Sequence, residues 1–397
     1  MKNPYRRTMY ACFAGYIVQA IVNNFVPLLF ITFQKSYGIS LAKITFLITF
    51  NFGIQLLVDL LSAGFIDRIG YRASILTAHV CSGAGLLCLA VLPGLLPDPF
   101  LGLLISVTIY AVGGGLIEVL VSPIMEACPF DNKKGIMSLL HSFYCWGHVG
   151  VVLISTLFFA CFGTESWQIL AVFWAIIPLA NTFIFAGAPI ASLKEEAGED
   201  MPVRILLSMK TFWVMILLML CAGACEQAVS QWASAFAEKG LGISKTAGDL
   251  AGPMTFALLM GSSRALYSRL SQKLDLLTAL MGSGLLCLFS YLLITLAPWA
   301  PVQLLGCALC GFSVGILWPG TFSLASERLR GGTAMFALFA LAGDLGCSLG
   351  PTLVGSVSGM AGDELQAGIL AAVCFPVLLL LGLLQLHTTK RKPVLAG

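Results

Sequence analysis

The chain is built from a series of apolar runs, each close to the length of about 20 residues that an α-helix needs to cross a bilayer. Helices are favoured because they satisfy their own backbone hydrogen bonds in lipid. The pattern predicts an all-α membrane protein with twelve transmembrane helices. These are Thr8–Phe33, Lys43–Ile66, Ala73–Leu95, Phe100–Met125, Gly135–Phe162, Ser166–Pro189, Thr211–Ala237, Ala247–Leu270, Leu274–Ala297, Val302–Ala325, Thr333–Val357 and Leu365–Leu386.

The composition supports a lipid environment. Of the 397 residues, 58% are hydrophobic and only 10% are charged, whereas a soluble domain carries roughly 25% charged residues. So few charges cannot cover a protein of this size in water, so we expect a lipid bilayer around it and no nucleic-acid partner. The 13 cysteines fall largely within apolar runs, where a thiol acts as a small hydrophobic group, and we expect no metal and no cofactor.

The two halves of the chain resemble each other. Residues 192–204 form the only sustained polar stretch and are predicted to be a cytoplasmic linker between six-helix bundles at 1–191 and 205–397. A shift of 196 positions places Gly115 on Gly311 and Pro123 on Pro319. Glycines and prolines at matched depth indicate duplication. We therefore expect two pseudo-symmetric bundles with a binding site between them.

The basic residues give the orientation. Eighteen of the 22 Lys and Arg residues fall on one side of the predicted helices, together with both termini, and four fall on the other. The positive-inside rule then predicts that both termini are cytoplasmic. We expect a multi-pass protein of the plasma membrane, which in a bacterium is the inner membrane.

The loop after the second predicted helix reads Gly64-Phe-Ile-Asp67-Arg68-Ile-Gly70-Tyr-Arg72. It resembles the loop signature of the major facilitator superfamily. The resemblance implies a twelve-helix transporter in which this loop is a cytoplasmic gate. An acid beside a neighbouring helix N-terminus meets the positive end of its dipole, and glycines permit a tight turn.

A narrower resemblance covers most of the chain. The segments Gly113-Gly-Gly-Leu-Ile-Glu118, Leu140-His141, Trp318-Pro319 and Asn23-Asn24 are similar to the fucose:proton symporter branch. This resemblance implies uptake of fucose, galactose or glucose, with an acid at Glu118. The branch also has a helix-1 acid after the Asn pair, and Pro27 stands at that place here.

Ionisable groups within the apolar runs are the candidates for ion coupling, because charge at that depth is costly and is usually functional. They are Glu118, His141, Glu226 and Asp344. Glu118 and His141 lie about equally far from the loop between their helices, so we expect them to pair. A static pair that packs two helices is the alternative. Asp59, Glu126 and Arg264 lie close to predicted helix ends and are interpreted as gate or snorkelling residues.

Polar and aromatic side chains at similar depth are the candidates for solute binding. Amides and carboxyl groups suit the hydroxyls of a sugar, and aromatic rings can stack on its apolar face. Helix packing is the alternative for each of them. The predicted set is Gln19, Asn23, Asn24, Glu118, His141, Tyr144, Gln227, Gln231, Trp232 and Trp318.

These patterns predict a secondary transporter that takes up a small polar solute, most simply a monosaccharide, by alternating access. Proton coupling is favoured, while sodium coupling and uncoupled transport stay open. The rivals are an exporter of drugs or metabolites with the same fold and a receptor that binds without translocating. An enzyme is not expected, because no nucleophile–base or metal pattern is present. We expect a monomer.

Overall fold

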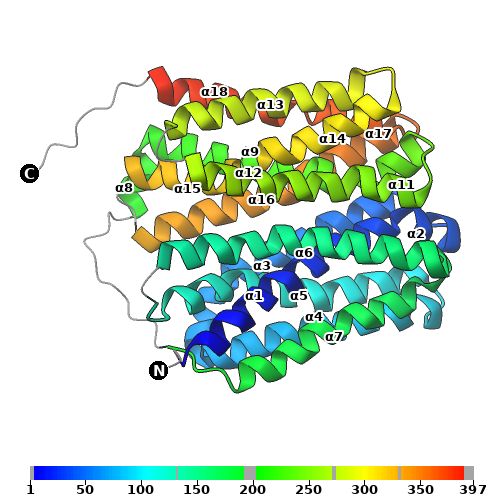
Figure 1. The fold of residues 1–397 in the computed structure, drawn as a ribbon, viewed down its shortest axis with the longest axis horizontal. Coiled ribbons are helices and arrows are strands. Elements are labelled where there is room, and N and C mark those ends of the chain that lie inside the picture. Colours follow the sequence, from blue (N-terminus) through cyan, green and yellow to red (C-terminus); the bar gives the residue numbers. More distant parts are fainter. Residues whose placement is uncertain (1–3, 131–132, 192–202, 271–273, 330–331, 389–397) are drawn as a thin grey trace, which may run out of the picture.

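The computed structural model describes residues 4–130, 133–191, 203–270, 274–329 and 332–388. It is all-α, as predicted, and its long helices run roughly parallel to one axis (Figure 1). Eleven helical stretches in the described part of the chain are long and apolar enough to cross a membrane. The eighth predicted helix is also helical throughout, from 245 to 270, but it carries Lys245, Asp249 and Arg264, which make it more polar.

The first half contains six crossings. The first crossing is interrupted and consists of α1, the 3₁₀ turn η1 and α2, whereas the next five are continuous helices. Their bounds are α1 Arg6–Asn24, η1 Val26–Leu29, α2 Phe30–Tyr37, α3 Leu41–Ile69, α4 Tyr71–Leu95, α5 Pro99–Glu126, α6 Lys133–Phe162, η2 Thr164–Ser166 and α7 Trp167–Ala186.

The second half repeats this plan with more interruptions. Two π-helical turns, η3 and η4, flank the connection between its first two crossings. The bounds are α8 Val203–Ser208, α9 Lys210–Ser230, α10 Ala233–Ala235, η3 Phe236–Gly240, α11 Lys245–Asp249, η4 Leu250–Met254, α12 Thr255–Leu270, α13 Leu276–Leu296, α14 Ala300–Val314, α15 Leu317–Arg328, α16 Gly332–Met360, α17 Leu365–Ala371 and α18 Cys374–Thr388.

The two halves form separate bundles, one in the lower and one in the upper part of Figure 1. Within the first bundle α1 packs on α6 and α3 on α5, and the equivalent pairs α9–α16 and α12–α14 pack in the second. The bundles meet along two seams, α3 against α16 and α6 against α12. Most of the predicted linker lies outside the described residues, so the exact domain boundaries stay a prediction.

The duplicated glycines lie at equivalent helix contacts. A Cβ atom on Gly115 of α5 would lie 3.1 Å from the Cα of Gln55 in α3, and one on Gly311 of α14 would overlap the carbonyl oxygen of Phe256 in α12. Small residues let helix backbones approach closely where no hydrophobic force drives association. The same device therefore builds the same contact in both bundles.

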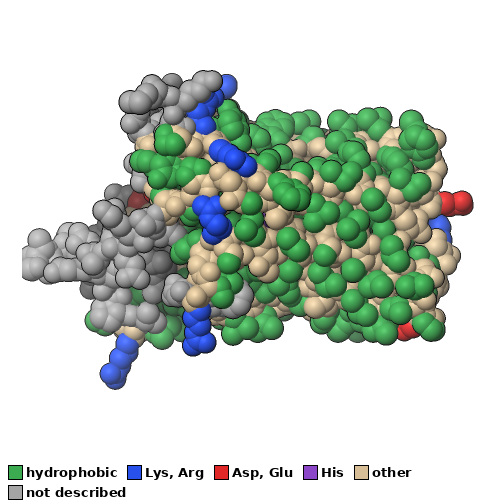
Figure 2. Space-filling view, turned by 90° about the horizontal axis from the view of Figure 1, so that it is seen from below, with side chains coloured by type: hydrophobic (Ala, Val, Ile, Leu, Met, Phe, Trp, Pro, Cys, Tyr) green, Lys and Arg blue, Asp and Glu red, His purple; other side chains and the backbone are tan. Residues whose placement is uncertain are grey.

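The beginning of α1 and the end of α18 lie at one end of the molecule, which we call the terminal end; the other is the distal end (Figure 1). Figure 2 shows hydrophobic side chains along the length of the body, most of the visible Lys and Arg near the terminal end, and Asp and Glu together with some Lys or Arg at the distal end. Large apolar side chains such as Phe183, 76% exposed, and Leu60, 57% exposed, point outward. An apolar surface of this extent suits lipid and not water.

We predict that Gly346→Ala destabilises the protein by about 1–3 kcal/mol, the usual cost of overpacking. A Cβ there would overlap the carbonyl oxygen of Leu220, which is backbone and cannot rotate away. Gly359→Ala on the same helix is the matched control, since a Cβ there meets nothing within 4 Å. Thermal unfolding in detergent measures both, and equal midpoints would contradict the packing of α16 on α9.

Candidate functional site

A chain of hydrogen bonds joins three helices of the first bundle. Gln19 on α1 donates from Nε2 to the Oε2 of Glu118 on α5 at 3.0 Å and to the Oε1 of Gln55 on α3 at 3.3 Å. The Nε2 of Gln55 donates to Oδ1 of Asn23 at 3.0 Å. Gln19 and Asn23 are four residues apart and so share one helix face. This places two predicted solute ligands beside the predicted coupling acid.

The chain of hydrogen bonds continues into the second bundle. Gln231 donates to the backbone oxygen of Asn23 and to Oε1 of Gln227, both at 3.0 Å, and Gln227 donates to Oε1 of Glu226 at 3.3 Å. Arg264 on α12 approaches Glu226 at 3.9 Å. Its Nε donates to the carbonyl oxygen of Gly315, where α14 gives way to α15. Polar groups therefore run from Glu118 to Arg264 across both bundles.

The predicted Glu118–His141 pair is not formed among the described contacts. Glu118 uses Gln19 instead, and the His141 ring lies 5.3 Å from the Tyr16 ring, centroid to centroid. Tyr16 in turn hydrogen-bonds Ser122 at 2.8 Å. The sequence gives the depth of Glu118 and His141 along their helices but not which side chains they contact. The contact between His141 and Tyr16 was therefore not predicted.

His141 is exposed even though it faces other parts of the protein. It lies near Arg264 of the opposite bundle and against Tyr16 of its own. Its accessible surface must therefore open between the bundles. Nearby, Nδ2 of Asn24 donates to the hydroxyl of Tyr144 at 3.4 Å. Of these predicted residues, His141 is exposed, Tyr144 is half-buried and Asn24 is buried.

Two acids face each other across the α3–α16 seam. The carboxyl groups of Asp59 on α3 and Asp344 on α16 lie within hydrogen-bonding reach. Both carboxyl oxygens of Asp59 are buried and have no donor among the described residues. Of the two interpretations of Asp59, snorkelling is therefore wrong, and a gating role stays a prediction. Arg264 does not snorkel either, because it reaches Glu226 and Gly315 inside the protein.

The two predicted tryptophans have different surroundings. Trp232 is fully buried, donates from Nε1 to the carbonyl oxygen of Pro351 at 3.0 Å and lies 5.5 Å from the Phe30 ring. In this state Trp232 contacts both bundles. Trp318 is half-buried and covers Gly343, where an added Cβ would overlap the indole ring. Their roles in solute binding stay predictions.

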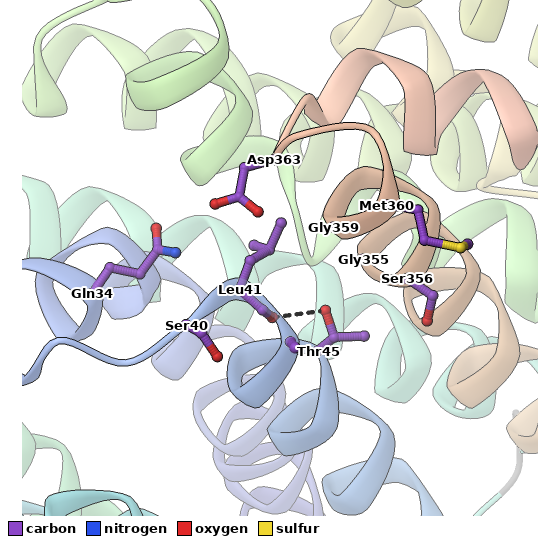
Figure 3. A pocket seen from close by; sticks show the side chains of 10 residues that line it. Gln34, Ser40, Leu41, Thr45, Gly355, Ser356, Gly359, Met360 and Asp363 are labelled. Carbon is purple, nitrogen blue, oxygen red and sulfur yellow. Dashed lines mark hydrogen bonds between the residues drawn. The ribbon is translucent and has the colours of Figure 1, made fainter.

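The bundles are closed at the distal end. Lys35 pairs with Glu238 at 2.8 Å, Lys245 donates to the carbonyl oxygen of Leu28 at 2.5 Å, and the hydroxyls of Thr49 and Thr352 lie 2.5 Å apart. Beyond the threonines lies a hollow of about 420 Å³ (Figure 3). It is lined by Gln34, Ser40, Leu41, Ala42, Thr45, Gly355, Ser356, Gly359, Met360 and Asp363.

The predicted gate loop is described in part. Gly64 and Asp67 fall within the last turns of α3, but the side chain of Asp67 lies outside what the structure describes, and Arg68 is exposed. Gly70 has a φ of +82°, which favours glycine at this turn. Arg72 donates to three carbonyl oxygens at the end of α7, those of Phe185, Ala186 and Ala188, at 2.9–3.0 Å. These bonds stay within the first bundle, so a gating role of the loop stays a prediction.

The described residues include no group of three or more His, Cys, Asp or Glu side chains arranged to hold a metal ion. The site consists of amides, carboxyl groups, one imidazole, one guanidinium and aromatic rings at the interface of two duplicated bundles. Such an arrangement can bind a polar solute and change its own charge by protonation.

The sequence matches the family model described as Major Facilitator Superfamily over residues 11–351. The chain belongs to the major facilitator superfamily. This confirms the resemblance inferred from the loop after the second helix. No curated protein matches the chain by sequence.

Solved structures share this fold along almost their whole length. A variant of the E. coli fucose:proton symporter is 17% identical with a TM-score of 0.67, over 96% of this chain and 98% of that chain. A D-xylose-proton symporter is 14% identical with a TM-score of 0.77, over 95% and 96%. A mutant of the nucleoside transporter NupG is 13% identical with a TM-score of 0.74, over 96% and 99%. At these identities the likeness shows the fold.

We predict that Thr49→Cys combined with Thr352→Cys allows an oxidant to form a disulfide that locks the distal end. Hydroxyls 2.5 Å apart place the two side chains within reach of the short geometry that a disulfide requires. Solute exchange should stop on oxidation and return on reduction. Each single variant is the control for the native cysteines, and unchanged exchange in the oxidised double variant would contradict a moving distal seam.

Proposed function

We propose that this major facilitator transporter takes up a small polar solute of the monosaccharide class by proton-coupled alternating access. The observation that carries the proposal is the continuous polar chain from Glu118 to Glu226, which runs through Gln19, Gln55, Asn23, Gln231 and Gln227. It crosses the bundle interface, where a solute would contact both halves. Rocking the bundles about that solute exposes it to each side in turn.

The chemistry of the lining supports a sugar. Gln19, Asn23, Gln227 and Gln231 supply donors and acceptors in pairs, as adjacent hydroxyls require. Tyr144 and Trp318, both half-buried, offer rings for the apolar face of a pyranose. An exporter of lipophilic compounds would instead need a wide, weakly polar lining. The sugar and nucleoside carriers among the similar structures define a reasonable panel of test solutes.

Glu118 is the best candidate for the main coupling acid. Its hydrogen-bond partner is the neutral amide of Gln19, whereas Glu226 has the guanidinium of Arg264 nearby. An acid inside the membrane without a cation is stabilised by taking up a proton, while a paired acid holds its charge. Protonation then changes the relative stability of the two states of the carrier. The exposed His141 can pass the proton to water.

The distribution of basic residues supports cytoplasmic termini. Lys and Arg gather near the terminal end (Figure 2), and the cytoplasmic side of a membrane protein carries the excess of these residues. The state described here, closed at the distal end, then faces inward. We propose a monomer in the plasma membrane, which in a bacterium is the inner membrane.

The experiment that tests the function is counterflow in proteoliposomes. Labelled fucose, galactose, glucose, xylose and a nucleoside are offered singly, with and without a pH or sodium gradient. We expect exchange of at least one sugar and its accumulation under an inward proton gradient. Exchange of only the nucleoside would show that the solute is a nucleoside and not a sugar. Accumulation only with a sodium gradient would make sodium the coupling ion. Exchange of a lipophilic cation alone would favour the exporter.

We predict that Glu118→Gln abolishes proton-driven accumulation and leaves solute exchange within a few-fold of the wild-type rate. The amide keeps the hydrogen bond with Gln19 but cannot change its charge. Glu126→Gln is the matched control, because Glu126 is an exposed acid at the end of the same helix. Full accumulation by Glu118→Gln would remove this residue from the coupling mechanism.

A further inference from the structure

The α3–α16 seam is an antiparallel contact with a definite register. Near the distal end, a Cβ on Gly355 would meet Oγ1 of Thr45, and Thr49 contacts Thr352. Toward the terminal end, Asp59 lies ten residues beyond Thr49, and Asp344 lies eight residues before Thr352. At 1.5 Å per residue these steps are about 15 Å and about 12 Å. The register therefore places Asp59 and Asp344 at similar depth along the seam.

The pair is an acid–acid contact without a neutralising cation. In the described part of the chain neither aspartate has an ion-pair partner. Both Asp59 oxygens are buried and lack a donor, although Asp344 is within hydrogen-bonding reach. Two carboxylates contain no hydrogen between them, so the contact is satisfied only when one of them carries a proton that it donates to the other.

The titratable groups around the pair are acidic. The titratable side chains that interact electrostatically with the aspartates are Glu118 of α5 and Cys347 of α16, and Glu226 of α9 interacts with Cys347. No charged side chain of α4, α8, α15 or α17 faces the pair among the described residues. Arg264, the guanidinium of this region, contacts Glu226 and Gly315. Among the described residues around Asp59 and Asp344, no cation is placed to neutralise the pair in place of a proton.

We propose that Asp59 and Asp344 form a second proton-binding site, in which one shared proton joins the two bundles across the α3–α16 seam. With the proton bound, the carboxyl group of one bundle donates to the carboxylate of the other, and the seam closes. When the proton leaves, two facing carboxylates repel and the seam opens at this depth. The inference deepens the proposed proton coupling and rests on it only for the role in transport.

The test is infrared spectroscopy of the reconstituted full-length protein, titrated with pH in the absence of solute. A protonated carboxyl group has a carbonyl band that a carboxylate lacks and that shifts in D₂O. Because the proton is shared, Asp59→Asn and Asp344→Asn should each abolish the same band. Asp98→Asn is the aspartate control, since Asp98 is an exposed helix N-cap and Asn caps a helix equally well. Glu118→Gln should remove a different band.

Several results would overturn the proposal. Two bands lost separately in the two variants would show independent acids, and no change in either variant would show that the pair holds no proton. Loss of the wild-type band on adding sodium at constant pH would make sodium the bound ion. Size-exclusion chromatography confirms that each variant is folded, and Asp59→Glu serves as a second variant that should keep a shifted shared band.

A transport readout separates the site from the proposed function. With both aspartates present, the rate of cross-linking between Thr49→Cys and Thr352→Cys should fall as pH rises through the band's midpoint, relative to the same pair in an Asp344→Asn background. Neither the infrared titration nor the cross-linking needs a transported solute. If no sugar exchanges but the shared band is present, the proposed solute class is wrong and the proton site is supported. If a sugar exchanges but the shared band is absent, the proton site is wrong and the proposed solute class is unaffected.

Discussion

The main constraint on this structure is that polar groups inside a protein surrounded by lipid need partners. Taking a charge out of water costs several kcal/mol even after relaxation, so each buried polar group must find a partner. The amide and ionisable groups of the site find it near the interface of the two bundles. Gln19 serves Glu118, Gln227 serves Glu226, and Arg264 lies between Glu226 and the open end of α14.

The duplicated architecture places different charges at its two seams. The α6–α12 seam carries Arg264 beside Tyr144 and Cys145, whereas the α3–α16 seam carries Asp59 and Asp344. Related bundles supply similar helices, but the side chains at the seams differ in sign. A proton can therefore act on one seam and leave the other unchanged. Because the two seams differ in this way, a protein with two similar halves can respond to a proton gradient across the membrane.

Much of the fold could be predicted from the sequence, because helix length, apolar runs and matched glycines are local signals. The contacts of the site were less accessible. Helix depth placed Glu118 and His141 at one level, but Tyr16 stands beside both, and rotation about a helix axis is set by packing. Asp59 and Arg264 were assigned to helix ends because they lie seven and six residues before the predicted ends at Ile66 and Leu270. Only the seam shows that these residues face inward.

The distal closure explains why the polar chain and the acid pair act together. Lys35, Lys245 and the Thr49–Thr352 contact hold the bundles at one end, so rocking must separate or join them at the other. Asp59 and Asp344 lie on that path, further along the helices that the threonines join. A change of charge there acts on the same two helices that the threonines join in this state. Protonation near Glu118 and movement of the bundles are thereby linked through one pair of helices, α3 and α16.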